Sequence, residues 1–177
     1  MGTYTKEIKS LQHPIVKHLF KLRKNKKYSL EKKQLVIEGK KIITEYPGPI
    51  DLLLTCDDSS FISSKIRSRI KVSIEIIKKL SSTKSPEPFI AQVQRPENAP
   101  LEKKKRILCL DEVKDPGNVG TLIRSATAFG FDGVFLTSHS ADPFMCKALS
   151  AARGATFRIP IMIAPLNDLL KIIKKNN

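Results

Sequence analysis

The part of the sequence that most constrains the fold is an apolar run at residues 107–110, followed by a tight turn and a helical pattern. The turn, residues 115–120, reads DPGNVG, and the helical pattern after it extends to about Phe129. Gly130 is placed to end that helix, and a second apolar run begins at Val134. This order predicts a βαβ unit whose first loop lies at the carboxyl end of a strand, where open α/β sheets bind ligands.

The rest of this part of the chain also has regular patterns. The helix after the turn has an apolar stripe at helical spacing, formed by Val119, Leu122, Ile123 and Ala126. We expect a further helix at residues 143–152, a strand at 157–163 and a last amphipathic helix at 166–174.

The sequence before residue 95 alternates short strand patterns with short helix patterns. We predict helices at residues 5–33, 40–46, 61–70 and 76–80. Pro14 is expected in an early first turn of the first of these helices, where proline is tolerated. We predict strands at residues 35–37, 50–55, 72–74 and 89–93. Residues 95–105 (RPENAPLEKKK) are charged and poor in large apolar side chains. The predicted class is therefore α/β, with one domain at residues 1–98, a linker at 99–105 and a second domain at 106–177.

Basic residues are concentrated in the first part of the chain. Residues 1–105 contain 23 basic and 11 acidic side chains, against 9 and 6 in residues 106–177. The density is highest from residue 17 to residue 33, where eight basic side chains accompany one acid. This imbalance predicts a polyanion partner, and nucleic acid fits better than a membrane because the apolar side of the segment is short and lacks Trp. The side chains expected to contact the nucleic acid are Lys17, Lys21, Arg23, Lys24, Lys26 and Lys27.

Helical spacing divides this basic segment into two faces. Lys17, Lys21 and Lys24 recur at intervals that place them on one side of a helix. The opposite, buried side is predicted to be formed by Val16, Leu19, Phe20 and Leu22.

Composition excludes several classes of protein. No uncharged apolar run approaches the roughly 18–20 residues that span a bilayer, and the N-terminus has no secretory pattern. Cys56, Cys109 and Cys146 are widely spaced, so we expect buried free thiols and neither a disulfide framework nor a zinc site. The three histidines have no ligand spacing and are interpreted as ordinary surface or loop residues, and no metal site is predicted. These features predict a soluble, cytoplasmic protein.

The turn at residues 115–120 has the residues of a phosphate site in outline. Gly117 and Gly120 allow backbone or ligand to approach closely, and Asn118 is expected at the N-cap. Arg124 lies farther along the helix, off the apolar stripe. The turn is not a P-loop, because the GxxxxGK[ST] pattern is missing, and its GxxG is only part of a dinucleotide-binding fingerprint. It also differs from the GxxG of KH domains, which joins two helices, whereas this one follows a predicted strand. On the residues alone, a ligand site and a tight structural turn with a solvated Arg are equally compatible with the pattern.

Longer stretches of the sequence resemble a known family. Residues 110–134 (LDEVKDPGNVGTLIRSATAFGFDGV) resemble motif 1 of the SpoU/TrmH branch of the SPOUT methyltransferases, and residues 147–160 (KALSAARGATFRIP) resemble the segment that follows it. Residues 13–17 (HPIVK) and 36–40 (VIEGK) are similar to parts of the SpoU substrate-binding domain, which has an L30e-like fold, and residues 80–93 resemble its last strand. The resemblance covers nearly the whole chain.

The resemblance implies an L30e-like RNA-binding domain followed by the first part of a Rossmann-like, parallel-sheet SPOUT domain. It implies methyl transfer from S-adenosylmethionine to ribosomal or transfer RNA, usually to a ribose 2′-OH, by a homodimer. The functional Asn and Arg of motif 1 correspond to Asn118 and Arg124. The other residues of the loop are Asp115, Pro116, Gly117 and Gly120. In the family the Arg binds RNA beside a phosphate and helps to activate the 2′-OH, and the Asn would orient the loop or the substrate.

The chain also departs from the family pattern. The family's cofactor lies in a C-terminal trefoil knot, yet only 17 residues follow Pro160, without the expected Gly-rich strand end or Ser-Leu-Asn stretch. We therefore expect a chain truncated before the knot, with its cofactor-binding residues unknown. Residues 150–153 (SAAR) stand where Arg-Ala-Ser is common. Two other hypotheses stay open: a non-catalytic RNA-binding protein or fragment without cofactor binding, and a nucleotide- or phosphometabolite-binding α/β protein that uses the loop.

Overall fold

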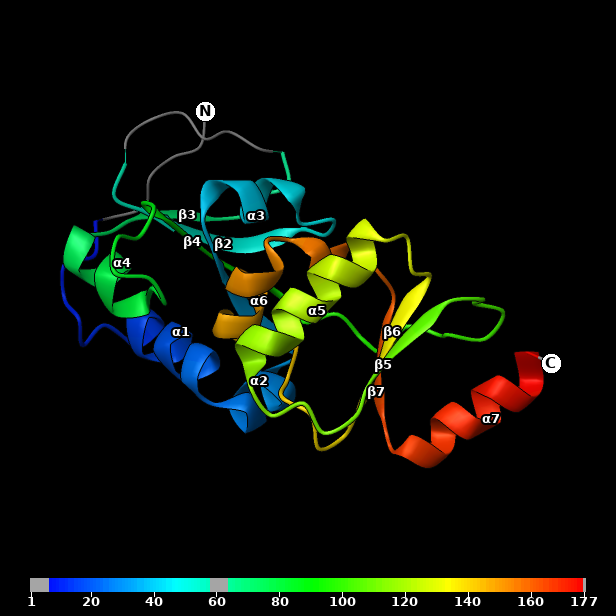
Figure 1. The fold of residues 1–177 in the computed structure, drawn as a ribbon. Helices are drawn as coiled ribbons and strands as arrows, with labels where there is room; N and C mark the ends of the chain where they lie inside the picture. The colour runs from blue at the N-terminus through cyan, green and yellow to red at the C-terminus, as the bar shows by residue number, and fades with distance from the viewer. Residues whose placement is uncertain (1–6, 58–63, 177) are drawn as a thin grey trace. The chain divides into compact units, whose positions relative to one another are not determined.

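The computed structural model describes residues 7–57 and 64–176, and it places the backbone alone at residues 175 and 176. The chain forms two compact units of α/β type, Met1–Arg95 and Pro96–Asn177, as the sequence predicts for the fold class (Figure 1). None of the helices in the described ranges is long and apolar enough to cross a membrane.

The elements of the first unit are α1 (Pro14–Lys24), α2 (Lys26–Lys32), β1 (Gln34–Glu38), α3 (Lys40–Glu45), β2 (Ile50–Thr55), β3 (Arg69–Lys71), α4 (Ile74–Leu80) and β4 (Phe89–Gln94). The elements of the second unit are β5 (Ile107–Leu110), α5 (Pro116–Ala128), β6 (Gly133–Thr137), α6 (Cys146–Ala152), the 3₁₀ turn η1 (Ala155–Phe157), β7 (Ile161–Ala164) and α7 (Leu166–Asn176).

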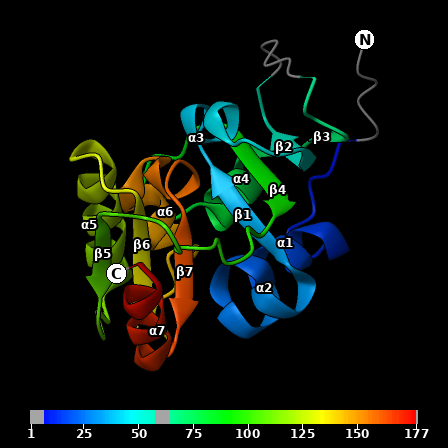
Figure 2. The ribbon, with the colours of Figure 1, turned by 90° about the vertical axis from the view of Figure 1, so that its right-hand side faces the viewer.

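The sheet of the first unit has four strands in the order β1-β4-β2-β3. β4 is antiparallel to β1, which lies beside it in Figure 2, and to β2, whereas β2 and β3 are parallel. Successive side chains of a strand point to opposite faces, so that Val36, Leu54 and Ile90 lie on one face and share a core with α1 and α4. The L30e-like classification of this unit stays a prediction.

The basic N-terminal segment forms two helices where the sequence predicted one. α1 begins at Pro14, with the His13 side chain accepting a hydrogen bond from the backbone N–H of Ile15 at 3.3 Å. Asn25 then interrupts the helix, because its side chain accepts from the backbone N–H of Tyr28 at 2.9 Å and thereby starts α2. The prediction of one helix over residues 5–33 is therefore wrong at its start and at Asn25, whose cap the apolar periodicity does not reveal.

The segment before α4 also differs from the prediction. Of the helix predicted at residues 61–70, positions 61–63 lie outside the described residues, and the remainder contains a bridge at Ile66 and the strand β3. The strand predicted at 72–74 is displaced, since Ile74 already begins α4. Pairing with β2 fixes β3, and a short apolar run does not contain that long-range information.

The second unit confirms the predicted βαβ arrangement. Its three strands are parallel and lie in the order β5-β6-β7. α5 and α6 cover one face of this sheet and α7 covers the other (Figure 1). On the α5 side, Val119 and Ile123 pack with Val134 of β6. On the α7 side, Phe135 packs with Leu169. The motif-1 loop therefore follows the edge strand β5 at its carboxyl end.

Three predicted features of this unit need correction. Leu122 is 36% exposed, so the buried stripe of α5 is narrower than its apolar spacing suggested. α6 begins at Cys146 and not at residue 143. Of the strand predicted at residues 157–163, Phe157 lies in η1 and only residues 161–163 lie in β7.

Residues within the predicted linker pack on the second unit. The backbone N–H of Ala99 donates to Ile161 O at 2.9 Å, and Leu101 is fully buried in a core with Phe135. The two compact units divide after Arg95, ahead of the linker that the sequence suggested at residues 99–105. The buried Leu101 and the backbone hydrogen bond of Ala99 together attach this charged segment to the second unit.

The cysteines are less buried than expected. Cys109 is exposed, and Cys56 and Cys146 are half-buried, so the expectation of three buried thiols is wrong. Cys109 lies on β5, which is an edge strand of the three-stranded sheet and is therefore incompletely covered.

Candidate functional site

The loop between β5 and α5 is held by an aspartate cap. Asp115 is the N-cap of α5, and its carboxylate accepts a hydrogen bond from the backbone N–H of Asn118 at 2.9 Å. Pro116 occupies the first helical turn, where its missing N–H costs nothing. The prediction that Asn118 is the N-cap is therefore wrong. Asn118 is the third residue of α5, and its exposed side chain is left available for a ligand.

An ion pair fastens this cap to the following helix. Lys147 Nζ, from α6, lies 2.6 Å from Asp115 Oδ2. The hydrogen bond from Lys147, and after it that from the backbone N–H of Asn118, lowers the pKa of Asp115 below its usual value. Both partners are partly exposed, so the pair defines the position of the loop more than it stabilises the fold.

Substituting Lys147→Met should raise the pKa of Asp115 toward its usual value. A group whose pKa is lowered by folding contributes stability above its unfolded pKa, and this contribution is lost as the pH falls through the folded pKa. In the variant, the cap should therefore loosen at a higher pH than in the wild type. An NMR pH titration of the Asp115 side-chain carbon measures the shift directly. Lys171→Met, which removes an exposed ammonium paired with Asp168 on α7 instead, is the control and should leave the Asp115 titration unchanged.

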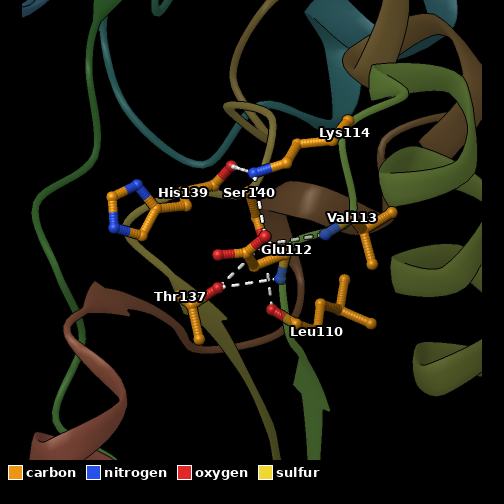
Figure 3. A network of polar contacts seen from close by, with 7 residues as sticks. All are labelled: Leu110, Glu112, Val113, Lys114, Thr137, His139 and Ser140. Carbon is orange, nitrogen blue, oxygen red and sulfur yellow. Dashed lines mark hydrogen bonds and ion pairs between the residues drawn. The ribbon is translucent and has the colours of Figure 1, made fainter.

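Two buried hydroxyl groups support the start of the loop, as Figure 3 shows. Ser140 Oγ donates to Leu110 O at 3.0 Å and accepts from the backbone N–H of Val113 at 3.2 Å. Thr137 Oγ1 accepts from the backbone N–H of Glu112 at 2.9 Å. The two hydroxyls lie 3.2 Å apart in the interior. The segment after β6 therefore supplies the hydrogen-bond partners that the segment after β5 needs.

Further contacts join the same two segments. Ala141 N donates to Val113 O at 2.8 Å. Lys114 Nζ donates to His139 O at 3.1 Å, as Figure 3 shows. Glu112 has a φ of 50°, in the left-handed region that non-glycine residues seldom adopt. The chain therefore leaves β5 through a constrained bend, which contacts between the segments after β5 and after β6 hold in place. Asp115 follows this bend, so its position is fixed as well.

The two motif glycines are required by close packing. A Cβ atom on Gly120 would collide with the carbonyl oxygen of Ala148 and lie 2.9 Å from the Cβ of Ala151, both in α6. A Cβ atom on Gly117 would lie 2.8 Å from Asp115 Oδ1. Gly120 therefore lets α5 and α6 approach each other, and Gly117 leaves room for the capping carboxylate.

Arg124 is exposed on α5 and makes no hydrogen bond or ion pair with the described part of the chain. It lies six residues after Asn118, which on an α-helix corresponds to about 9 Å along the axis and about 120° around it. The structure therefore brings together Asp115, Asn118 and Lys147 at the start of α5 and places Arg124 separately, on another side of the same helix.

The predicted basic face forms on α1 and α2 with one exception. The exposed lysines of these helices include Lys17, Lys21, Lys24, Lys26, Lys27 and Lys32. Arg23 is half-buried, and its guanidinium donates to Lys79 O at 3.2 Å, so this side chain joins α1 to α4 and does not share the solvent-exposed face. No acidic residue occurs in α1, which leaves its lysines without intrahelical partners of opposite charge.

A polar cluster beside this face was not predicted. His18 Nδ1 lies 2.9 Å from Tyr28 Oη, and His18 Nε2 lies 3.2 Å from Gln34 Oε1. Lys21 Nζ is 4.2 Å and Lys32 Nζ 5.6 Å from the centroid of the Tyr28 ring. The interpretation of His18 as an ordinary surface residue is therefore wrong. His18 and Tyr28 are ten residues apart on different helices, and sequence spacing offers no signal for their contact.

Comparison with known families agrees with the loop geometry. The model of the SpoU rRNA Methylase family matches residues 105–177, which contain β5, the loop and α5. Residues 105–177 are therefore similar to the SpoU rRNA methylase family. The resemblance noted from motif 1 is thereby confirmed.

Two similar proteins are longer than this chain. The 23S rRNA (guanosine(2553)-2′-O)-methyltransferase RlmP of Bacillus subtilis is 33% identical over 163 residues, covering 89% of this chain and 64% of RlmP. The mitochondrial rRNA methyltransferase 3B of Danio rerio is 34% identical over 172 residues, covering 85% of this chain and 38% of the relative. The chain thus spans less than two thirds of these proteins.

Solved structures show the same fold. An AdoMet-bound rRNA methyltransferase from Sinorhizobium meliloti matches 97% of this chain over 69% of its own length, with a TM-score of 0.85 and 28% identity. The SpoU methyltransferase AviRb from Streptomyces viridochromogenes, in complex with AdoMet, matches with a TM-score of 0.79 and 20% identity, which shows the fold alone.

A site for S-adenosylmethionine would need free polar groups at the carboxyl edge of the three-stranded sheet. At this edge, the hydroxyls of Thr137 and Ser140 already form hydrogen bonds with the backbone of residues 110–113, so neither is left unpaired. A cavity of about 340 Å³ is lined by residues of β7, α7 and the segment before β5, among them Glu102, Met162 and Asp168, and none of its lining residues belongs to the motif-1 loop. No group of three His, Cys, Asp or Glu side chains in the described ranges could hold a metal ion.

Proposed function

We propose that the whole protein transfers a methyl group from S-adenosylmethionine to the ribose 2′-OH of a ribosomal or transfer RNA. The observation that carries this proposal is the motif-1 loop, held at the carboxyl end of β5 with Asn118 and Arg124 exposed. The similarity to RlmP, whose name specifies 2′-O methylation of 23S rRNA, supports the choice of acceptor. The homodimer and the cytoplasmic location stay predictions.

The two exposed side chains have separate roles in this proposal. Arg124 binds a phosphate of the RNA backbone beside the acceptor and helps to polarise the 2′-OH. The pKa of an arginine is too high for it to remove a proton alone, so the phosphate is part of this role. Asn118 orients the substrate at the start of α5 through its exposed side chain. S-adenosylmethionine, when bound, supplies the methyl group.

The basic face of the first unit holds the RNA. Exposed lysines on α1 and α2 neutralise backbone phosphates without reading the sequence. For three to five phosphates in a single-stranded region, the slope of log K against log salt is expected to lie between about −2 and −4. An affinity that stays constant between low and moderate salt would contradict this part of the proposal.

The experiment that tests the activity uses S-adenosylmethionine with a labelled methyl group. The protein is incubated with ribosomal and transfer RNA transcripts, and the labelled RNA is digested with alkali. A 2′-O-methyl group blocks alkaline cleavage at its own nucleotide, so label recovered in alkali-resistant dinucleotides is the expected result. Label in mononucleotides would indicate a methylated base. RNA binding without calorimetric binding of S-adenosylmethionine would favour the non-catalytic alternative for this chain.

A further inference from the structure

α1 has an exposed aromatic side chain beside its lysines. Phe20 is 36% exposed, whereas its neighbours Leu19 and Leu22 are buried, so the sequence prediction that Phe20 joins the buried stripe is wrong. Lys17 and Lys24 lie three residues before and four residues after Phe20, and both are exposed on the same side of the helix.

A lysine of α4 completes this surface. Lys79 Nζ lies 5.7 Å from the centroid of the Phe20 ring and donates to Leu11 O at 3.1 Å. Leu11 is itself 38% exposed. The surface therefore combines two exposed apolar side chains with the ammonium groups of three lysines, one of which is held in place by a backbone carbonyl.

The second aromatic residue of this region differs from Phe20 in one important respect. Tyr28 is half-buried, and its hydroxyl pairs with His18 Nδ1. The hydroxyl group of Tyr28 thus has its hydrogen-bond partner within the protein. Phe20 has no hydroxyl to satisfy and a ring that solvent reaches, so Phe20 is the aromatic that a ligand can contact.

We propose that the surface formed by Leu11, Lys17, Phe20, Lys24 and Lys79 binds an unpaired base of a single-stranded RNA loop. Phe20 stacks on the base, and the lysines contact the phosphates on either side. Proteins bind single-stranded nucleic acid by combining cationic side chains with aromatic stacking, and a base inside a duplex has no free face to offer. The inference rests on RNA binding in the proposed function and adds the kind of RNA structure that this surface selects.

The chain contains no Trp, so Phe20→Trp introduces a single fluorescent reporter at this position. We expect its emission to be quenched when the full chain binds a hairpin RNA with an unpaired loop, and not when it binds a duplex of the same stem. Phe129→Trp makes the same change at a Phe that is 76% exposed at the end of α5, and it should not respond to the hairpin. Unchanged emission of Phe20→Trp with bound hairpin would overturn the proposal.

Binding of the same RNAs to Phe20→Leu gives an independent measurement. Leucine keeps an apolar side chain but removes the flat ring, so hairpin affinity at constant salt should fall about tenfold, in the range of a lost base stack. Duplex affinity should stay within twofold, and thermal melting should show a folded protein. An equal loss of affinity for both RNAs, or no loss for either, would contradict base stacking by Phe20 but not RNA binding by the protein. If wild-type protein binds neither RNA, the RNA-binding part of the proposed function fails together with this inference.

Discussion

Gly120→Ala should strongly destabilise the second unit. The new methyl group would collide with the carbonyl oxygen of Ala148, which is backbone and cannot rotate away, and with the Cβ of Ala151. α5 and α6 would have to separate, and overpacking of this kind costs about 3 kcal/mol. The ion pair between Asp115 and Lys147 would be strained as well, because its two members lie at the start of these helices.

Thr121→Ala is the matched control for this substitution. Thr121 is the next residue of α5 and is exposed, so replacing it by the better helix former Ala should leave stability unchanged or raise it by roughly 0.5 kcal/mol. Urea unfolding followed by circular dichroism compares the two variants, and amide hydrogen exchange shows whether protection is lost in α5 and α6. If both variants unfold at the same urea concentration, the close approach of the two helices is not important for stability.

Much of the second unit could be predicted from its sequence, because apolar periodicity and turn chemistry are local. The strand at residues 107–110, the helix after the loop and the parallel strand beyond Val134 follow from such patterns and are confirmed. The N-cap was assigned to Asn118 and belongs to Asp115 because both residue types cap helices well. Sequence alone does not decide between two good caps three residues apart.

Other features depend on contacts that sequence spacing does not contain. Phe20 and Leu122 fit an apolar stripe, yet the width of the buried face is fixed by what packs against the helix. The bonds of His18 to Tyr28 and Gln34 join three separate elements. The support of the loop by Thr137 and Ser140 likewise depends on β5 and β6 being neighbours, so it becomes visible only when the sheet is formed.

Arg124→Ala in the whole protein should lower the rate of methyl transfer by at least about 100-fold, as is typical for the loss of a group that stabilises developing charge. Thermal stability should not change, because Arg124 is exposed and makes no hydrogen bond or ion pair with the described part of the chain. RNA affinity should fall by less than tenfold, since most phosphate contacts are assigned to α1 and α2. The loss should therefore appear mainly in kcat, measured with labelled S-adenosylmethionine at saturating RNA.

Two further variants make this test specific. Arg124→Lys keeps the positive charge but removes the planar fork of donors, so it should recover only part of the rate if bidentate phosphate binding is the role of Arg124. Arg67→Ala removes an exposed arginine of the first unit that pairs with Asp51, and it should retain full activity. Undiminished methylation by Arg124→Ala would remove this residue from the mechanism. Full recovery by Arg124→Lys would show that charge alone is needed, and the acceptor ribose would then be positioned by other groups, of which Asn118 is the first to test.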